Sequence, residues 1–300
     1  MSNQKTMDVV FATTSQTYGQ MSGPKPVRSR MQLHHDVYIG LYSEKLWDEV
    51  FKVCQPAGYS FAPVPQFGQL YAFWNENPAD PSGLIWDPDR SLATAVALSR
   101  LIHPTRAGFR YSARVILGFG DSIKQIIPGS VSGLLADAYV AAPTARDWLT
   151  DSDALTLGSL LTRYHTTSTA LPPRVRRALW DHEYAAAIKW IDVRWTIIAT
   201  ALESLVHTDR FQSTRQFVNR VTALANRVGV GFSRQDSQDA YDNRSSLAHG
   251  QDLSNTDPPT TALYCRMEEV LRVAIRTAIE DDNFRDIFLD ENRIRREFPL

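Results

Sequence analysis

The C-terminal part of the chain has the most regular pattern of apolar residues. Between 182 and 207 the apolar positions are separated by alternating steps of three and four, which places them on one face of a helix. They are Ile188, Ile191, Trp195, Ile198, Leu202 and Leu205. Similar spacing predicts helices over 213–228, 234–249 and 259–280. Because the connections between these helices are short, we expect an antiparallel bundle.

Capping residues mark the ends of two of these helices. Ser233 can cap the helix over 234–249, and Asp236 three residues later fits an acidic variant of the capping box. Gly250 suits the position just after that helix, where the left-handed backbone is common. Pro258-Pro259 is typical of the first turn of the helix that follows.

The first half of the chain has a weaker pattern. Residues 1–30 are rich in Ser, Thr, Gln, Gly and Pro, so we expect little regular structure there. Residues 55–90 contain many Pro, Gly and Asn residues among aromatic ones and predict turns and short strands. The run Val115-Ile116-Leu117 favours a strand.

Three helices are predicted in the same half. Residues 37–53 have apolar positions at helical spacing, and 91–102 follows Asp87-Pro88-Asp89 and is also expected to be helical. Asp151 and Asp153 are suitable caps for a helix over about 154–164.

These patterns predict two domains and a mainly α fold. The Ser, Thr and Pro residues around 166–173 indicate a linker, so we place the boundary at about 170. Residues 1–170 then form an N-terminal helix-rich mixed domain, and residues 171–300 form an antiparallel helical bundle. The bundle is closed by a helical C-terminal extension with apolar residues at Phe284, Ile287, Phe288 and Ile294.

Composition limits the classes of function. The chain has 300 residues, 43% of them hydrophobic, a net charge of -1 and a pI of about 6.7, which argues against a constitutive nucleic-acid coat protein. Its two cysteines, Cys54 and Cys265, are far apart and form neither a disulfide framework nor a zinc-site pattern. The N-terminus lacks the apolar run of a signal peptide, and no run is long enough to span a bilayer. We therefore expect a cytoplasmic protein that has no membrane partner, metal ion or cofactor.

The segment around Arg244 and His249 carries the strongest candidate chemistry. On an ideal helix Arg244 shares a face with Ala240 and Leu247, so its charge needs an anionic partner or a hydrated cleft. His249 lies in the last helical turn, where the negative end of the helix dipole favours the imidazolium form and suits proton transfer. A guanidinium beside an imidazole can hold a phosphate and move protons around it.

Simpler interpretations of these residues remain open. His249 can be only a helix cap, and Arg244 can pair with Asp242, Glu203 or another carboxylate. A basic cluster beside the linker is usually a solvated surface, but it can also steer RNA phosphates. That cluster consists of Arg174, Arg176 and Arg177. The tryptophans of the bundle fit core or dimer contacts better than a base-stacking platform, and they are Trp180, Trp190 and Trp195.

Two phrases of the sequence resemble the HEPN superfamily, and within it the ApeA-like branch. One is Ala201-Leu202-Glu203-Ser204-Leu205 on an early helix, and the other is Arg244-Ser245-Ser246-Leu247-Ala248-His249-Gly250. The resemblance covers roughly 180–290 and leaves 1–170 without an explanation. It implies a HEPN-like helical bundle that forms homodimers, in which the two Arg-x4-His motifs meet at a shared cleft.

The resemblance also implies a mechanism. The RNA 2′-OH attacks the adjacent phosphorus without a metal ion, leaving a 2′,3′-cyclic phosphate and a 5′-OH. His249 would act as general base or acid, and Arg244 would stabilise the phosphorane charge. Glu203 matches the acidic position of the early helix and would orient Arg244 or His249, or support a buried polar network. Ser245 and Asn243 flank the arginine, and many active members have Asn, Asp or His where this chain has Ser245.

Two functions follow as hypotheses. The first is a metal-independent endoribonuclease, a toxin or defence effector whose N-terminal domain responds to an unknown trigger or antitoxin. The second is a non-catalytic HEPN-like module that binds nucleotides, RNA or a protein and serves dimerisation. Catalysis at a shared cleft requires the two motifs to face each other across a two-fold axis. Burial of Arg244 and His249 within one protomer, paired to carboxylates and closed to solvent, would contradict it.

Overall fold

The computed structural model describes most of the chain as two compact units, one up to Thr162 and one from Arg163 onward. The division falls inside helix α3 (Asp151–Thr167). The residues described are 5–14, 25–54, 68–76, 91–105, 107–118, 122–128, 148–188, 190–208, 211–253 and 257–300. None of the helices in these ranges is both long and apolar enough to cross a membrane.

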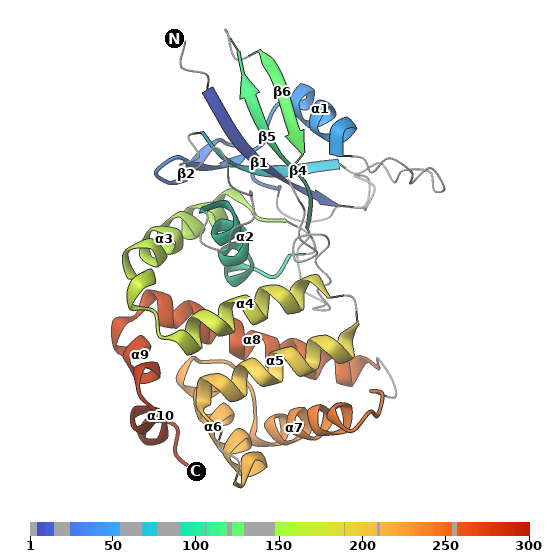
Figure 1. Ribbon diagram of the computed structural model, residues 1–300. Coiled ribbons are helices and arrows are strands. Elements are labelled where there is room, and N and C mark those ends of the chain that lie inside the picture. The colour runs from blue at the N-terminus through green and yellow to red at the C-terminus, as the bar shows by residue number, and fades with distance from the viewer. Residues whose placement is uncertain are drawn as a thin grey trace. The chain divides into compact units, whose positions relative to one another are not determined.

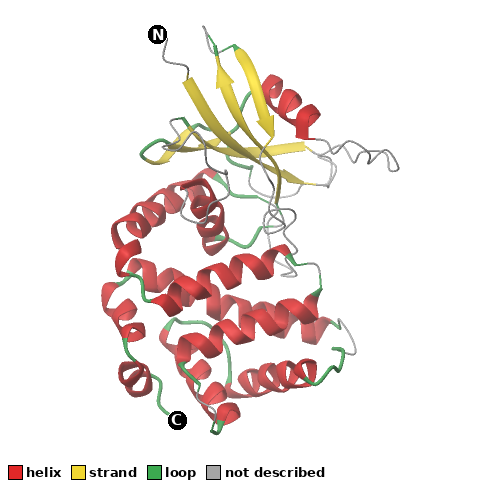
Figure 2. Ribbon diagram, viewed as in Figure 1, coloured by secondary structure: helices red, strands yellow, loops and turns green. Residues whose placement is uncertain are grey.

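The first unit, called the sheet unit here, is built on a six-stranded antiparallel sheet (Figures 1 and 2). Its strand order is β2-β3-β4-β1-β5-β6, and every neighbouring pair is antiparallel. The strands are β1 (Lys5–Thr14), β2 (Met31–His34), β3 (Val37–Gly40), β4 (Gly68–Asn75), β5 (Gly108–Leu117) and β6 (Ile123–Pro128). The central strand β1 therefore lies between strands that come much later in the chain.

Alternation along β1 gives each face of the sheet its own core. Met7, Val9 and Phe11 lie in one apolar cluster with Leu46 and Val50 of helix α1 (Glu44–Cys54). Residues of β1 with the opposite parity are also buried, as expected for a sheet covered on both faces. Helix α2 (Ser91–Ile102) contacts β4 and is buried over almost its whole length.

The prediction of a mainly α protein with a helix-rich N-terminal domain is wrong, because the sheet organises this unit. Residues 1–30 contain β1, and the helix predicted over 37–53 is strand β3 followed by α1. Strand pairing joins segments far apart in sequence, so its stabilisation is invisible in a local pattern. The predicted helix over 91–102 and the strand around Val115-Ile116-Leu117 are confirmed.

The second unit, called the helical unit here, contains seven α-helices among its described residues besides the end of α3. They are α4 (Pro173–Ala187), α5 (Ile191–Val206), α6 (Ser213–Arg227), α7 (Arg234–Ala248), α8 (Pro258–Glu280), α9 (Asp282–Asp286) and α10 (Glu291–Glu297). Helix α5 contacts α4, α6, α7 and α8, so it lies at the centre of the unit (Figure 1).

Most positions of the apolar stripes predicted for this unit are buried, including Trp195, Ile198, Leu202 and Leu205 on α5. Ile188, Ile191 and Val228 are only half-buried. One boundary prediction is wrong, because 182–207 forms parts of two helices. The backbone is extended at Ile188, where α4 ends, and again at Trp190, which precedes α5. Each helix has its own buried face, so the apolar spacing runs through the break without marking it.

Candidate functional site

Helix α7 begins and ends with the caps that its sequence predicts. Ser233 accepts a hydrogen bond from the Asp236 backbone N–H, and the Asp236 carboxylate accepts one from the Ser233 backbone. At the other end the Gly250 N–H donates to the Leu247 carbonyl, and φ at Gly250 is 78°. These bonds form a Schellman motif, so His249 occupies the last position before the chain reverses.

Hydrogen bonds from three neighbouring helices hold α7 in place. The Trp195 indole of α5 donates to the Ala240 carbonyl at 3.0 Å. The Arg266 guanidinium of α8 donates to Asp236 at 2.6 Å. Two hydroxyl pairs connect α6 to α7, namely Ser213 with Tyr241 and Thr222 with Ser237. The residues at the end of α7 therefore stand on a well-supported helix.

Arg244 pairs with Glu203, although 41 residues separate them in the sequence. The guanidinium donates to the Glu203 carboxylate at 2.8 Å, and its carbon lies 5.8 Å from the centre of the Tyr241 ring. Exposed fractions are 28% for the Arg244 side chain and 14% for the Glu203 side chain. Burial raises the pKa of Glu203, and the charge of Arg244 lowers it in part. Among the alternatives that the sequence left open, Glu203 is therefore the partner of Arg244.

His249 lies on the surface at the C-terminal end of α7. Its backbone N–H donates to the carbonyls of Ser245 and Ser246, and its imidazole has no hydrogen-bond partner among the described residues. Asn243 and Ser245 are half-buried on the same turn as Arg244. Arg244 and His249 thus both reach solvent near the end of one helix, but no described hydrogen bond connects their side chains.

The three arginines predicted to steer RNA differ in their surroundings. Arg174 donates to the Ser204 carbonyl at 2.9 Å, which ties α4 to the C-terminal end of α5. Arg177 is exposed and pairs with Asp181 one turn later on the same helix. Arg176 is exposed on α4. Arg176 and Arg177 are on the surface, whereas Arg174 belongs to an internal hydrogen-bond network.

That network is centred on His207, just after α5, which the sequence did not single out. Its two ring nitrogens lie 3.3 Å from Arg174 and 3.2 Å from Arg295, and its carbonyl accepts a hydrogen bond from Arg220. Burial lowers the pKa of His207, Glu291 raises it, and the three arginines lower it further. Three helices, α4, α6 and α10, and the residue after α5 supply these side chains, so no local motif could have revealed the cluster.

The charges around the end of α7 are mixed. Burial raises the pKa of Asp192, at the start of α5, and the nearby charge of Asp252 raises it further. Asp252 comes three residues after His249, so carboxylates as well as Arg244 lie near this end of α7. In the part of the chain that the structure describes, no three His, Cys, Asp or Glu side chains gather in a way that could hold a metal ion.

This arrangement can bind a phosphate group and exchange protons with it. Arg244 offers guanidinium donors next to solvent, and His249 offers an exposed imidazole five residues later. No family model matches the chain, and no curated protein or solved structure matches it either.

Proposed function

We propose that the helical unit is a metal-independent endoribonuclease of HEPN type, with Arg244 and His249 as its catalytic residues. One observation carries the proposal: Arg244 is held by Glu203 without being closed to solvent, near the exposed His249 at the end of the same helix. Burial of both residues against carboxylates would have contradicted catalysis at a surface cleft. A role as toxin or defence effector extends this proposal by analogy to the family.

The ion pair between Arg244 and Glu203 is suited to hold the arginine while leaving it able to bind substrate. Pairs of this kind near solvent contribute about 0–1 kcal/mol, so an RNA phosphate can share or replace the carboxylate at small cost. Glu203 restricts the guanidinium before substrate arrives, which reduces the entropy lost on binding. Glu203 is therefore proposed as a positioning residue.

In the proposed reaction the 2′-oxygen of a ribose forms a bond to the adjacent phosphorus, and the bond to the 5′-oxygen breaks. His249 takes the proton from the 2′-OH or delivers one to the leaving 5′-oxygen. Arg244 donates hydrogen bonds to the equatorial oxygens, whose negative charge grows in the transition state. The products are a 2′,3′-cyclic phosphate and a 5′-OH. DNA lacks the nucleophile and is not cut.

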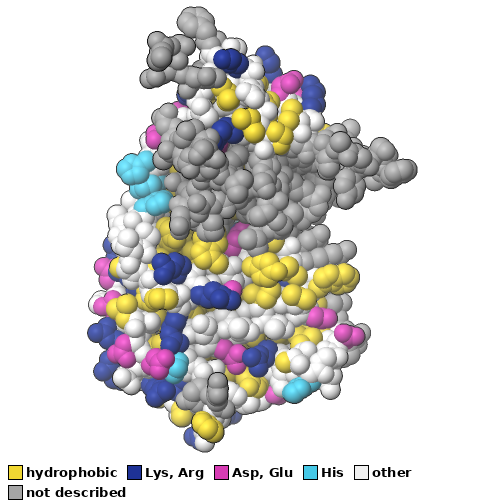
Figure 3. All heavy atoms as spheres, in the orientation of Figure 1, with side chains coloured by type: hydrophobic (Ala, Val, Ile, Leu, Met, Phe, Trp, Pro, Cys, Tyr) yellow, Lys and Arg dark blue, Asp and Glu magenta, His cyan; other side chains and the backbone are white. Residues whose placement is uncertain are grey.

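Homodimerisation of the helical unit is part of the proposal. Apolar side chains gather on its surface around α4 and α5 (Figure 3). Tyr184, Trp190 and Val193 are among them, and Trp190 is 68% exposed. Large apolar side chains that stay exposed favour a protein contact. Val193→Asp should turn the dimer into a monomer in light scattering and remove RNA cleavage. The control Leu289→Asp should do neither, although Leu289 is 55% exposed and Val193 is 45% exposed.

The first test is RNA cleavage in EDTA by the wild type, His249→Ala and Arg244→Gln. Each variant should lose about 100-fold or more in rate, which is the usual contribution of a general acid or base or of one oxyanion donor. The matched control is Arg234→Gln, because Arg234 is exposed at the opposite end of α7. Products should end in a 2′,3′-cyclic phosphate, and a 2′-deoxy substitution should block cleavage at that position.

The control must keep the wild-type rate. Cleavage that both active-site variants retain, or that stops in EDTA, would contradict the proposal.

A second function is supported by the surroundings of Arg244 and His249. Glu203 already accepts a hydrogen bond from Arg244, and no described side chain orients the His249 imidazole. A non-catalytic module that binds RNA or nucleotides would need only the phosphate contact. It predicts that the wild type binds RNA without cleaving it, and that Arg244→Gln weakens binding whereas His249→Ala has little effect.

A further inference from the structure

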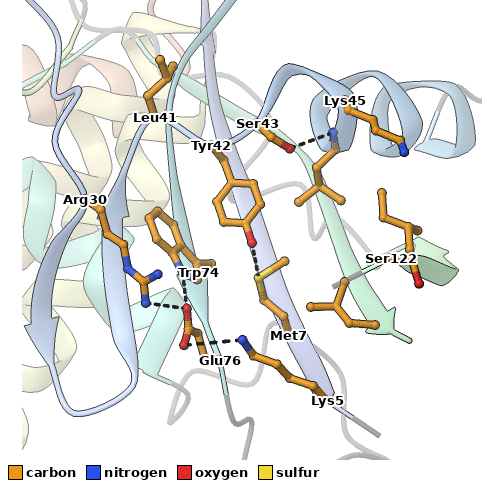
Figure 4. Close-up of a pocket in the computed structure, with 13 residues that line it drawn as sticks. Lys5, Met7, Arg30, Leu41, Tyr42, Ser43, Lys45, Trp74, Glu76 and Ser122 are labelled. Atoms are coloured by element: carbon orange, nitrogen blue, oxygen red, sulfur yellow. Dashed lines mark hydrogen bonds and ion pairs between the residues drawn. The ribbon is translucent and has the colours of Figure 1, made fainter. Parts of the chain in front are cut away.

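The sheet unit contains a cavity of about 400 Å³ on the α1 side of the sheet (Figure 4). Cavities that bind small molecules are typically about 300–1,000 Å³ in size. Its wall is made by strands β1, β4, β5 and β6, by residues 41–43 between β3 and α1, and by the first turn of α1. Single residues beside β2, β4 and β6 complete it. It belongs to the sheet unit alone and contains none of the residues proposed for RNA cleavage.

The floor of the cavity is apolar. Met7, Leu46, Trp74 and Leu117 are members of the buried cluster between α1 and the sheet, and Ile123 packs against that cluster. The half-buried ring of Tyr42 also lines the cavity, and its hydroxyl donates to the Met7 sulfur at 3.3 Å. A compound that enters the cavity therefore meets an apolar surface that includes two aromatic rings, those of Tyr42 and Trp74.

Among the residues that the structure describes, three cations and one carboxylate line the cavity: Lys5, Arg30 and Lys45 against Glu76. These described side chains carry an excess of two positive charges. Figure 4 shows Arg30, Glu76 and Lys5 on one side of Tyr42, with Lys45 on the other side. Lys45 has no hydrogen-bond or ion-pair partner among the residues that the structure describes.

Glu76 is already neutralised within the protein. It accepts a hydrogen bond from Arg30 at 2.6 Å and one from the Trp74 indole at 3.4 Å, and Lys5 lies 4.0 Å from its other oxygen. The Trp74 ring of the lining already has a cation beside it, because the Arg30 guanidinium lies 5.8 Å from the centre of this ring and 4.5 Å above the neighbouring Tyr38 ring. A cationic ligand would meet a site that the protein has filled with its own arginine.

We propose that this cavity binds a small amphiphilic anion, with an apolar body on the floor and one carboxylate or phosphate group at the lysines. Lys45 supplies the main contact to the acidic group. Lys5 adds to the positive field, and Glu76 keeps Arg30 at the rim. The site is separate from the RNA-cleavage proposal, so either can fail without affecting the other.

The test is calorimetric titration of the full chain with four naphthalene probes. They share the apolar body and differ in the polar group: the anions 1-naphthoate and 1-naphthyl phosphate, neutral 1-naphthol, and the cation 1-naphthylmethylammonium. At least one anion should bind with one-to-one stoichiometry, about 10-fold or more tighter than 1-naphthol, since a hydrogen bond to a charged group is worth this much. The tighter anion identifies the preferred acidic group. Binding should also weaken as salt is raised.

Three variants locate the site. Lys45→Gln should weaken the anion about 10-fold and leave 1-naphthol unchanged. Lys52→Gln is the matched control, because Lys52 lies on the same helix, pairs with Glu49 and does not line the cavity. Glu76→Gln keeps an acceptor for Arg30 but removes a negative charge, so the anion should bind more tightly. Unchanged melting temperatures for the two exposed lysine variants would exclude misfolding.

Several results would overturn the proposal. One is that neither anion binds at millimolar concentration. Another is that 1-naphthol binds as tightly as the anions, or that 1-naphthylmethylammonium binds more tightly. A third is that Lys45→Gln and Lys52→Gln have equal effects on the anion.

Discussion

Each unit contains an arginine–carboxylate pair that joins distant parts of the chain, but the two pairs have different surroundings. In the sheet unit Asp8 and Arg114 face each other across β1 and β5 and share two hydrogen bonds of 2.7 and 2.8 Å. Their side chains are 5% and 9% exposed. In the helical unit Arg244 and Glu203 share one described hydrogen bond of 2.8 Å, close to solvent.

The difference in exposure distinguishes an ion pair that only stabilises the fold from one whose arginine can bind a substrate. A buried, bidentate pair cannot exchange its partner without exposing a charge to a nonpolar interior, which costs several kcal/mol. A pair near solvent loses little when a phosphate replaces the carboxylate. Both pairs join an arginine to a carboxylate, so burial and the second hydrogen bond decide which arginine can meet a substrate.

The largest expected effect comes from breaking the buried pair. Asp8→Ala removes the carboxylate opposite Arg114 and should destabilise the sheet unit by about 3–5 kcal/mol, because it leaves a buried charge without its counter-ion. Hydrogen exchange of the β1 and β5 amides measures the loss. Glu203→Ala is the comparison and should cost the helical unit about 1 kcal/mol or less. Equal losses would show that burial does not separate the two pairs.

A smaller effect is expected at the end of α7. Gly250→Ala places a side chain at φ 78°, where an added Cβ meets no atom within 4 Å, so the cost is backbone strain of about 1–2 kcal/mol. Gly229→Ala is a matched control with φ 72° and equally open surroundings. Both should lower the melting temperature of the helical unit similarly. Only Gly250→Ala should also reduce RNA cleavage, because it shifts His249, and equal cleavage by both variants would contradict this.

Helix caps should matter about equally in the two units. Ser233→Ala removes the cap of α7, and Thr150→Ala removes the hydroxyl that accepts from the Asp153 N–H at the start of α3. Each should cost about 1 kcal/mol in urea denaturation. Ser233 lies at the end of α7 remote from Arg244, so Ser233→Ala should leave RNA cleavage unchanged. A cleavage defect equal to that of Gly250→Ala would show that the whole helix, and not its end, sets the activity.

The smallest effect is a pH dependence in the helical unit. Burial raises the pKa of Glu203 in the folded state, so folding favours its protonated form. Stability should therefore fall as pH rises from the unfolded value of this group through its higher folded value. Glu203→Gln should remove this decrease in the free energy of unfolding. Because the pair is partly exposed, we expect the decrease to be roughly 0.2–1 kcal/mol. Urea denaturation between acidic and neutral pH measures it.

Glu268 provides a control of opposite sign. Burial raises the pKa of its carboxyl, but the hydrogen bond from His182 and nearby positive charges outweigh burial and lower it overall. Its contribution should be present above the unfolded value and be lost as pH falls through the lower folded value. Glu268→Gln should therefore flatten the acid side of the profile. The same slope change in both glutamate variants would contradict the assigned directions.

The sequence determined most of the helical unit by itself. The apolar stripes of α5 to α8, the Ser233 cap and the Gly250 stop are local features, and the structure confirms them. These features can be predicted from the sequence because a helix is stabilised by contacts between residues three and four positions apart. The same local spacing did not predict the break between α4 and α5. The buried face of one helix can follow that of the other without a change in the spacing of apolar residues.

Only the tertiary structure decided the sheet and the surroundings of the candidate site. The order β2-β3-β4-β1-β5-β6 depends on pairing between strands far apart. The central strand has a β-favouring run, Val9-Val10-Phe11, but the polar composition of residues 1–30 as a whole hid it. The partner of Arg244 was one of several carboxylates until the packing of α5 on α7 selected Glu203. The cavity and the His207 cluster likewise combine residues from several elements. The sequence specifies the type of each side chain. Whether that side chain is buried, and which residue it pairs with, is decided only when distant segments pack together.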